Sequence, residues 1–139
     1  VVNETLRVRP ITPLNFGEAN VDTHLAGVSV PRGTTIFLLT NYLAQRDDHF
    51  ADAGTFEPER WLPDRKGNHD SKVFLPFGAG PRYCPGRNLA MVESTMATAM
   101  AACAFEFSRA PDAPPPQREE AFTVQPVGLR VKLARRPVG

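Results

Sequence analysis

A glycine-rich turn with a single cysteine stands directly before the longest apolar helical pattern of the chain. The turn comprises Phe77–Gly86 and reads Phe-Gly-Ala-Gly-Pro-Arg-Tyr-Cys-Pro-Gly. Gly78, Gly80 and Gly86 lack a Cβ atom, so the backbone can adopt positive φ angles and approach a flat ligand closely. The positive end of the following helix favours the charged thiolate of Cys84 over the thiol. We therefore expect this turn to present a thiolate to a metal.

The rest of the sequence predicts mostly short elements. Apolar residues recur at helical spacing from Leu89 to Cys103 with few charges among them, which predicts a helix that is buried on most sides. The run Ile36–Leu39 is apolar on both faces and predicts a buried strand, whereas alternation over 129–133 predicts a half-buried strand. Further expectations are a short helix at 1–9, strands at 28–30 and 104–108, a helical turn at 41–46, an ordered loop at 47–76 and an extended connector at 110–117.

Composition is typical of one soluble, globular domain. The chain has 139 residues and a mass of 15.3 kDa, with 42% hydrophobic and 22% charged residues. A formal net charge of +1 gives no reason to expect nucleic acid or an anionic membrane as a partner. Cys84 and Cys103 could form a bridge in principle, but their different settings favour a reduced, intracellular protein.

The start of the sequence indicates a portion of a longer protein. It opens with Val1 rather than methionine and enters a helical pattern at once. No run of about eighteen apolar residues and no basic-then-apolar leader is present. We therefore expect any leader or membrane anchor to lie upstream, and the sequence leaves membrane attachment undecided.

The cysteine turn resembles the haem-ligand loop of the cytochromes P450, Phe-x-x-Gly-x-Arg-x-Cys-x-Gly. The five fixed positions are filled, and the residues that match them are Phe77, Gly80, Arg82, Cys84 and Gly86. The resemblance implies that the Cys84 thiolate is the axial ligand of the iron in haem b, iron protoporphyrin IX. It also implies that Arg82 reaches a haem propionate and that Phe77 packs beside the sulfur. The alternative is a free cysteine in an ordinary glycine-rich loop.

Two further segments occur in the order that this family uses. Glu4-Thr-Leu-Arg7 matches Glu-x-x-Arg, and Phe56-Glu-Pro-Glu-Arg-Trp61 carries a Pro-x-Arg motif. In the family these segments supply a structural triad, which here would be Glu4, Arg7 and Arg60. Because a guanidinium group can hold a carboxylate with two hydrogen bonds, such a network can fix the loop that presents the cysteine.

The resemblance implies a fold and a function for the whole of residues 1–139. The fold would be α+β, a partial cytochrome P450 fold that is mainly α with small β-sheets and lacks the N-terminal part and the distal haem helix. The complete enzyme would be a monooxygenase that inserts one oxygen atom from O2 into a small organic substrate, with electrons from a reductase or a ferredoxin. We expect these residues alone to be inactive, because the distal half of the haem pocket is missing.

Two alternatives to this function stay open at the level of sequence. One is a truncated, non-catalytic remnant that binds haem weakly or not at all. The other keeps haem but rearranges peroxides instead of inserting oxygen. No P-loop, dinucleotide fingerprint or Gly-x-Ser-x-Gly motif points to another enzyme class.

The resemblance also assigns smaller roles. Residues 11–16 and 123–126 would border the substrate cavity, although ordinary loop packing is an equal alternative.

Many relatives carry a basic residue near the position of Gly17, and none stands there in this sequence, so propionate binding would depend more on Arg82 or on residues outside the chain. His24, His49 and His69 show no metal-binding spacing and are interpreted as surface or turn histidines.

Overall fold

The computed structural model describes residues 1–120 and 123–137, and within them it contains three α-helices, four 3-10 helices and eight strands. The α-helices are α1 (Val2–Val8), α2 (Thr40–Leu43) and α3 (Arg87–Ala104). The 3-10 helices are η1 (Pro58–Trp61), η2 (Pro63–Asn68), η3 (Ser71–Val73) and η4 (Gly80–Arg82). The strands are β1 (Asn15–Glu18), β2 (Thr23–Leu25), β3 (Val28–Val30), β4 (Thr35–Leu38), β5 (Phe105–Arg109), β6 (Gln117–Glu120), β7 (Val124–Val127) and β8 (Val131–Arg135).

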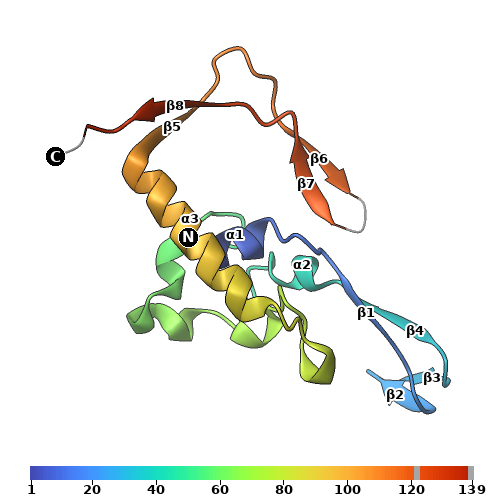
Figure 1. Cartoon of the computed structure of the whole chain (residues 1–139). Coiled ribbons are helices and arrows are strands. Elements are labelled where there is room, and N and C mark those ends of the chain that lie inside the picture. The colour runs from blue at the N-terminus through green and yellow to red at the C-terminus, as the bar shows by residue number, and fades with distance from the viewer. Residues whose placement is uncertain (121–122, 138–139) are drawn as a thin grey trace.

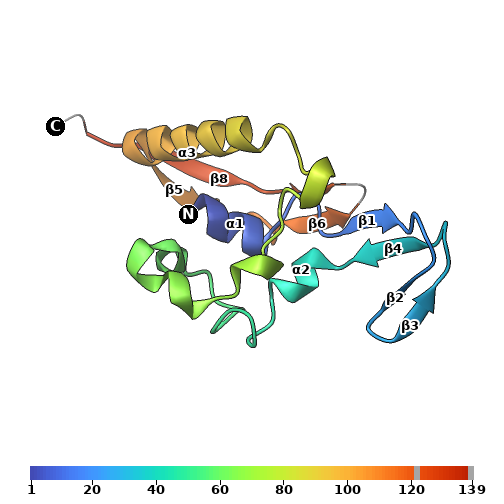
Figure 2. The ribbon, with the colours of Figure 1, turned by 90° about the horizontal axis from the view of Figure 1, so that it is seen from below.

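The strands of the described ranges form four separate antiparallel pairs. These pairs are β1–β4, β2–β3, β5–β8 and β6–β7. The β2–β3 hairpin closes through a two-residue turn, in which Ala26 and Gly27 both have positive φ angles of 49° and 83°. Two positive φ angles are typical of turns whose twist matches that of the flanking strands. The β1–β4 and β2–β3 pairs extend together away from the helices (Figures 1 and 2).

The buried core is small and lies beside α1. Ala44, Phe50 and Ala53 are buried, and Trp61 packs against them with its ring centroid 6.2 Å from that of Phe50. The segment 44–76 that supplies most of this core consists of turns and 3-10 helices, as the expectation of an ordered loop predicted. Phe74 also joins the cluster, which ties the chain just before the cysteine turn to the core.

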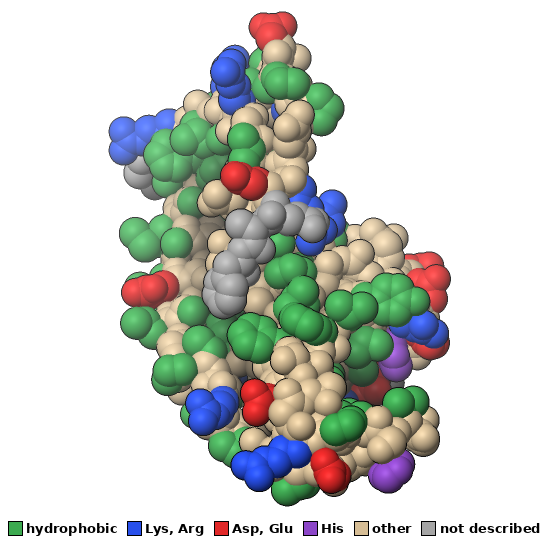
Figure 3. All heavy atoms as spheres, turned by 90° about the vertical axis from the view of Figure 1, so that its right-hand side faces the viewer, with side chains coloured by type: hydrophobic (Ala, Val, Ile, Leu, Met, Phe, Trp, Pro, Cys, Tyr) green, Lys and Arg blue, Asp and Glu red, His purple; other side chains and the backbone are tan. Residues whose placement is uncertain are grey.

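The apolar helix is present with bounds close to those predicted, but the expectation that it is buried is wrong for this chain. On α3, Leu89 and Met100 are 63% and 68% exposed, and Val92 and Met96 are also exposed. The reason is that, among the described elements, α3 contacts mainly α1 and β5. Figure 3 shows hydrophobic side chains at the surface of another face of the molecule as well.

Two strands differ from the prediction in the same way. β4 forms at the predicted place, but Phe37 and Leu38 are exposed because β4 pairs only with β1 in a two-stranded sheet. β8 is exposed along its whole length rather than half-buried. The predicted strand at 104–108 is confirmed as β5, which pairs with β8 directly after α3.

Candidate functional site: the cysteine turn and its support

The cysteine turn is closed by backbone hydrogen bonds between its ends. The N–H of Cys84 donates to the carbonyl oxygen of Phe77 at 2.9 Å, and the N–H of Tyr83 donates to Gly80 at 3.2 Å. Gly78 and Gly80 have φ angles of +73° and +71°, in the left-handed region that glycine adopts without strain. Two of the three glycines predicted to allow positive φ therefore do so, and the turn depends on them for its shape.

Cys84 lies at the N-terminal end of α3 with an exposed side chain. The N–H of Arg87, the first residue of α3, donates to the carbonyl oxygen of Cys84 at 3.3 Å. A Cβ atom placed on Gly86 would lie 3.7 Å from the Cys84 sulfur, at ordinary van der Waals distance, so position 86 is directly beside the sulfur. The position of Cys84 just before α3 is the one that the sequence predicted, while the effect of the helix on the thiolate stays a prediction.

The residues that match the haem-ligand motif lie together in this turn. Phe77 is half-buried, whereas Gly80, Arg82, Cys84 and Gly86 are exposed on the open side of the chain. Both cysteines are free thiols, and Cys103 lies 16 residues (103 − 87) after the first residue of α3, which is about 24 Å along the helix at about 1.5 Å per residue. The possibility of a bridge between Cys84 and Cys103 is therefore excluded.

Glu4 is the centre of a buried polar network between α1 and η1. Its carboxylate is fully buried and accepts five hydrogen bonds from described residues. Arg7 donates two of them through Nε and Nη2, at 2.9 and 2.8 Å. Arg60 Nε donates at 3.1 Å, the Glu57 N–H at 2.9 Å and Trp61 Nε1 at 2.9 Å. The structure thus brings together Glu4, Arg7 and Arg60, which the sequence placed in one triad.

The two arginines bind the backbone of the core segment as well. Arg7 Nη1 donates to the carbonyl oxygens of Ala44 and Ala53 at 2.9 and 2.8 Å, and Nη2 donates to Thr55 at 2.9 Å. All five N–H groups of Arg7 are therefore used. Arg60 Nη1 donates to the carbonyl oxygen of Ala51 at 3.0 Å. One carboxylate thereby anchors the irregular chain between α2 and η1.

The charge of Glu4 is strongly favoured in the folded protein. Burial alone would raise the pKa of Glu4, but the hydrogen bonds from Arg7, the Glu57 N–H and Trp61, with the charge of Arg7, lower it from 4.5 to about 2. Glu4 is therefore an anion throughout the physiological pH range.

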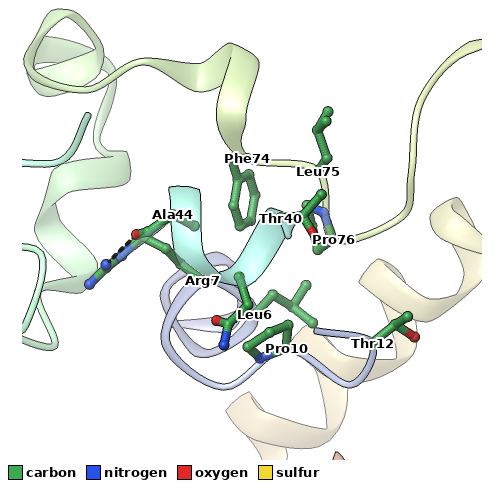
Figure 4. Close-up of a pocket in the computed structure, with 10 residues that line it drawn as sticks. Leu6, Arg7, Pro10, Thr12, Thr40, Ala44, Phe74, Leu75 and Pro76 are labelled. Carbon is green, nitrogen blue, oxygen red and sulfur yellow. Dashed lines mark hydrogen bonds between the residues drawn. The ribbon is translucent and has the colours of Figure 1, made fainter. Parts of the chain in front are cut away.

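The triad is connected to residues 74–76, which directly precede the cysteine turn, through a small cavity and an aromatic contact. Figure 4 shows this cavity, with Phe74 and Pro76 next to Thr40 and with Arg7 hydrogen-bonded to Ala44. The ring centroids of Trp61 and Phe74 are 4.5 Å apart, while Trp61 Nε1 bonds to Glu4. Sequence reasoning missed this role of Trp61, although its position directly after Arg60 was a usable signal.

The two segments predicted to border a substrate cavity lie side by side. The N–H of Val124 donates to the carbonyl oxygen of Ile11 at 2.7 Å. A Cβ atom on Gly78 would lie 3.8 Å from Asn15 Oδ1, so residues 11–16 also approach the cysteine turn. Over the described part of the chain, no helix is long and apolar enough to cross a membrane.

Comparison with known proteins gives one consistent family. The model of the family described as Cytochrome P450 matches residues 1–133. Pentalenene oxygenase of Streptomyces avermitilis is 33% identical over 139 residues, which cover 100% of this chain and 31% of that protein. An Arabidopsis thaliana protein named 3beta,22alpha-dihydroxysteroid 3-dehydrogenase is 44% identical over 92 residues, which are 66% of this chain and 20% of the relative.

A solved structure shows the same fold. The crystal structure of the cytochrome P450DA heme domain superposes with a TM-score of 0.89 at 23% identity, over 98% of this chain and 30% of that one. The partial P450 fold predicted from the sequence is therefore confirmed. The chain spans about a third or less of the length of these relatives. Haem b is the standard cofactor of the family, and by the match over residues 1–133 this chain belongs to the cytochrome P450 family.

Proposed function

We propose that residues 1–139 form the carboxy-terminal, haem-ligating portion of a cytochrome P450 monooxygenase and that the Cys84 thiolate would bind the haem iron. The observation that carries the proposal is the exposed Cys84 at the start of α3, in a turn shaped by glycines at positive φ. The family match supports the same reading.

The residues of the turn fit a haem with a thiolate ligand. Cys84 is an exposed, free cysteine, and glycine at position 86 places no side chain beside its sulfur. Phe77 is half-buried in the same turn and would limit the access of water to the sulfur. Arg82 is exposed beside it and would bind a propionate group through charge-assisted hydrogen bonds.

Haem bound in this way supplies the oxygen chemistry, in which one atom of O2 enters the substrate and the other becomes water with two electrons and two protons. The role of this chain is to hold the thiolate in position. The network of Glu4, Arg7 and Arg60 would fix the core segment, and Trp61 and Phe74 would transmit that restraint to the turn. No residue of the chain is proposed to transfer a proton.

The substrate is proposed to be a small organic molecule and the electron donor a reductase or a ferredoxin. Residues 11–16 and 123–126 would border the substrate, and the bond between Val124 and Ile11 supports their placement at one site. The part of the pocket on the other side of the haem would come from outside these residues.

The proposal is tested by the absorption of the reduced carbon monoxide complex of the full-length protein. We expect a long-wavelength Soret band for the unaltered protein and its loss in Cys84→Ser. Cys103→Ser is the matched control, because Cys103 is also an exposed, free thiol but lies at the other end of α3. A spectrum that is the same in Cys84→Ser and in the unaltered protein would remove Cys84 from the site.

A further inference from the structure

His69 is half-buried directly after η2 and packs against two aromatic rings, which its interpretation as a surface or turn histidine did not include. Its imidazole stacks on Phe50 with the ring centroids 5.3 Å apart and the planes 12° from parallel. The indole of Trp61 lies at 4.8 Å with an angle of 57°. The backbone of His69 also forms a bridge with that of Phe50, and the N–H of Asp70 donates to the carbonyl oxygen of His49 at 2.9 Å.

The surroundings of this ring suit a neutral imidazole. The Nδ1 atom of His69 is buried and has no hydrogen-bond partner among the described residues. A neutral imidazole needs to donate only one N–H, whereas an imidazolium must donate two. Protonation would therefore place a second N–H or an uncompensated charge where no acceptor is present, which is costly in a buried setting.

The charged groups around His69 do not compensate for such a charge. Arg60 on η1 and Arg7 on α1 repel a proton on the ring, while Glu4 and the neighbouring Asp70 attract it. Burial has the largest effect and, with Arg60, lowers the pKa of His69 below its ordinary value of 6.5. An imidazolium against Phe50 and Trp61 would gain a cation–π interaction, which acts in the opposite direction.

A short series of contacts leads from His69 to the cysteine turn. His69 packs on Trp61, whose ring packs on Phe74 at 4.5 Å. Phe74 stands three residues before Phe77, and the carbonyl oxygen of Phe77 accepts the N–H of Cys84 at 2.9 Å. Movement of His69 away from Trp61 would thus disturb the packing of the chain that enters the turn.

We propose that neutral His69 is a positioning residue for the cysteine turn, and that its protonation loosens residues 69–76 and weakens the hold of the turn on haem. This inference rests on the proposed function of Cys84. The direction of the pH dependence follows from the lowered pKa of His69, because the folded state holds the proton less tightly than the unfolded state. The stability that neutral His69 contributes is fully present above about pH 6.5. It is lost as the pH falls from that value toward the lower pKa that His69 has in the folded protein.

The test compares three forms of the full-length protein between about pH 7.5 and about pH 5, where histidines change charge. The forms are the unaltered protein, His69→Phe and His24→Phe, and the measurement is the fraction of the long-wavelength Soret band that survives incubation. Phenylalanine fills the stack without titrating, and His24 is an exposed histidine on β2.

On acidification, we expect the unaltered protein and His24→Phe to lose the same fraction of the Soret band. The fraction lost by His69→Phe should be smaller by about threefold or more. His69→Ala should lose the band even near neutral pH, because it removes the ring without replacing it. An acid profile of His69→Phe that follows the unaltered protein would overturn the inference while leaving the thiolate assignment intact.

A second readout does not involve haem. In the haem-free protein, an imidazolium next to Trp61 should quench the indole fluorescence as the pH falls below about 6.5. We expect this titration in the unaltered protein and its absence in His69→Phe. If Cys84 proves not to be a ligand, this titration still tests His69. The same pH dependence of the indole fluorescence in both proteins would refute the proposed titration of His69 beside Trp61.

Discussion

Replacement of Glu4 by glutamine is the sharpest test of the buried network. The change keeps the size of the side chain but removes its charge, and it turns one of the two accepting oxygens into a donor. Arg7 and Arg60, which are 0% and 3% exposed, would then face each other without a counter-ion. Removing one partner of a buried ion pair costs about 3–5 kcal/mol, and we expect a loss of this size in the free energy of unfolding.

The acid–base behaviour of Glu4 gives the same magnitude by a separate route. A fall in the pKa of Glu4 from 4.5 to about 2 corresponds to about 3 kcal/mol of stability. Because the pKa is lower in the folded state, this stability is fully present above pH 4.5 and is lost as the pH falls through about 2. The difference between the unaltered protein and Glu4→Gln should therefore be constant near neutrality and should shrink in acid.

The assay is equilibrium unfolding in urea, followed by the fluorescence of Trp61, at neutral and acidic pH. Glu106→Gln makes the same chemical change at a side chain that is 68% exposed and lies 3.7 Å from Arg136, and we expect it to cost less than about 1 kcal/mol. A loss in Glu4→Gln no larger than in Glu106→Gln, or a difference that does not vary with pH, would refute the argument that Glu4 is a buried anion held by the two arginines.

Three further changes have definite expected outcomes. Arg60→Lys keeps the charge but loses the planar donors that bind Glu4 and Ala51, so we expect the haem content per protein to fall. A haem content equal to that of the unaltered protein would contradict a role for the triad in holding the cysteine turn. Phe50→Ala empties the centre of the core and should cost about 3–5 kcal/mol in urea unfolding. Gly33→Ala should lower the free energy of unfolding by about 1–2 kcal/mol, because Gly33 has a φ angle of +83°. Gly17→Ala is the control, at an uncrowded glycine without a positive φ angle, and it should cost clearly less. Similar losses in the two variants would argue against backbone strain.

The elements of the fold could be predicted where the sequence pattern is local. Glycine and proline mark the turn before α3, and the apolar residues at helical spacing from Leu89 to Cys103 predict α3 itself. Burial could not be predicted in the same way, because an apolar pattern shows which side chains avoid water but not which element covers them. Met100 and Phe37 follow apolar patterns and are nevertheless exposed, since few described elements pack against α3 and β4.

In the candidate site, too, local motifs could be predicted from the sequence, whereas contacts between distant residues could not. The motif residues around Cys84 and the grouping of Glu4, Arg7 and Arg60 could be predicted from short motifs, although the proposed role of each in haem binding remains a prediction. The contacts of His69 could not be predicted, because they join residues that are distant in sequence and carry no shared motif. The stacking on Phe50 spans 19 positions and depends on the irregular path of the chain between them.

The short first helix has a consequence for biosynthesis. Seven residues are too few for a helix that persists in water by itself, and α1 carries two charges that end up away from solvent. The two charges pair with each other within the helix, and their other hydrogen-bond partners come from residues 44–61, which are synthesised later. The partners of α1 are complete only after the chain up to Trp61 has been synthesised, so Glu4 and Arg7 can reach their buried positions only after that point in translation.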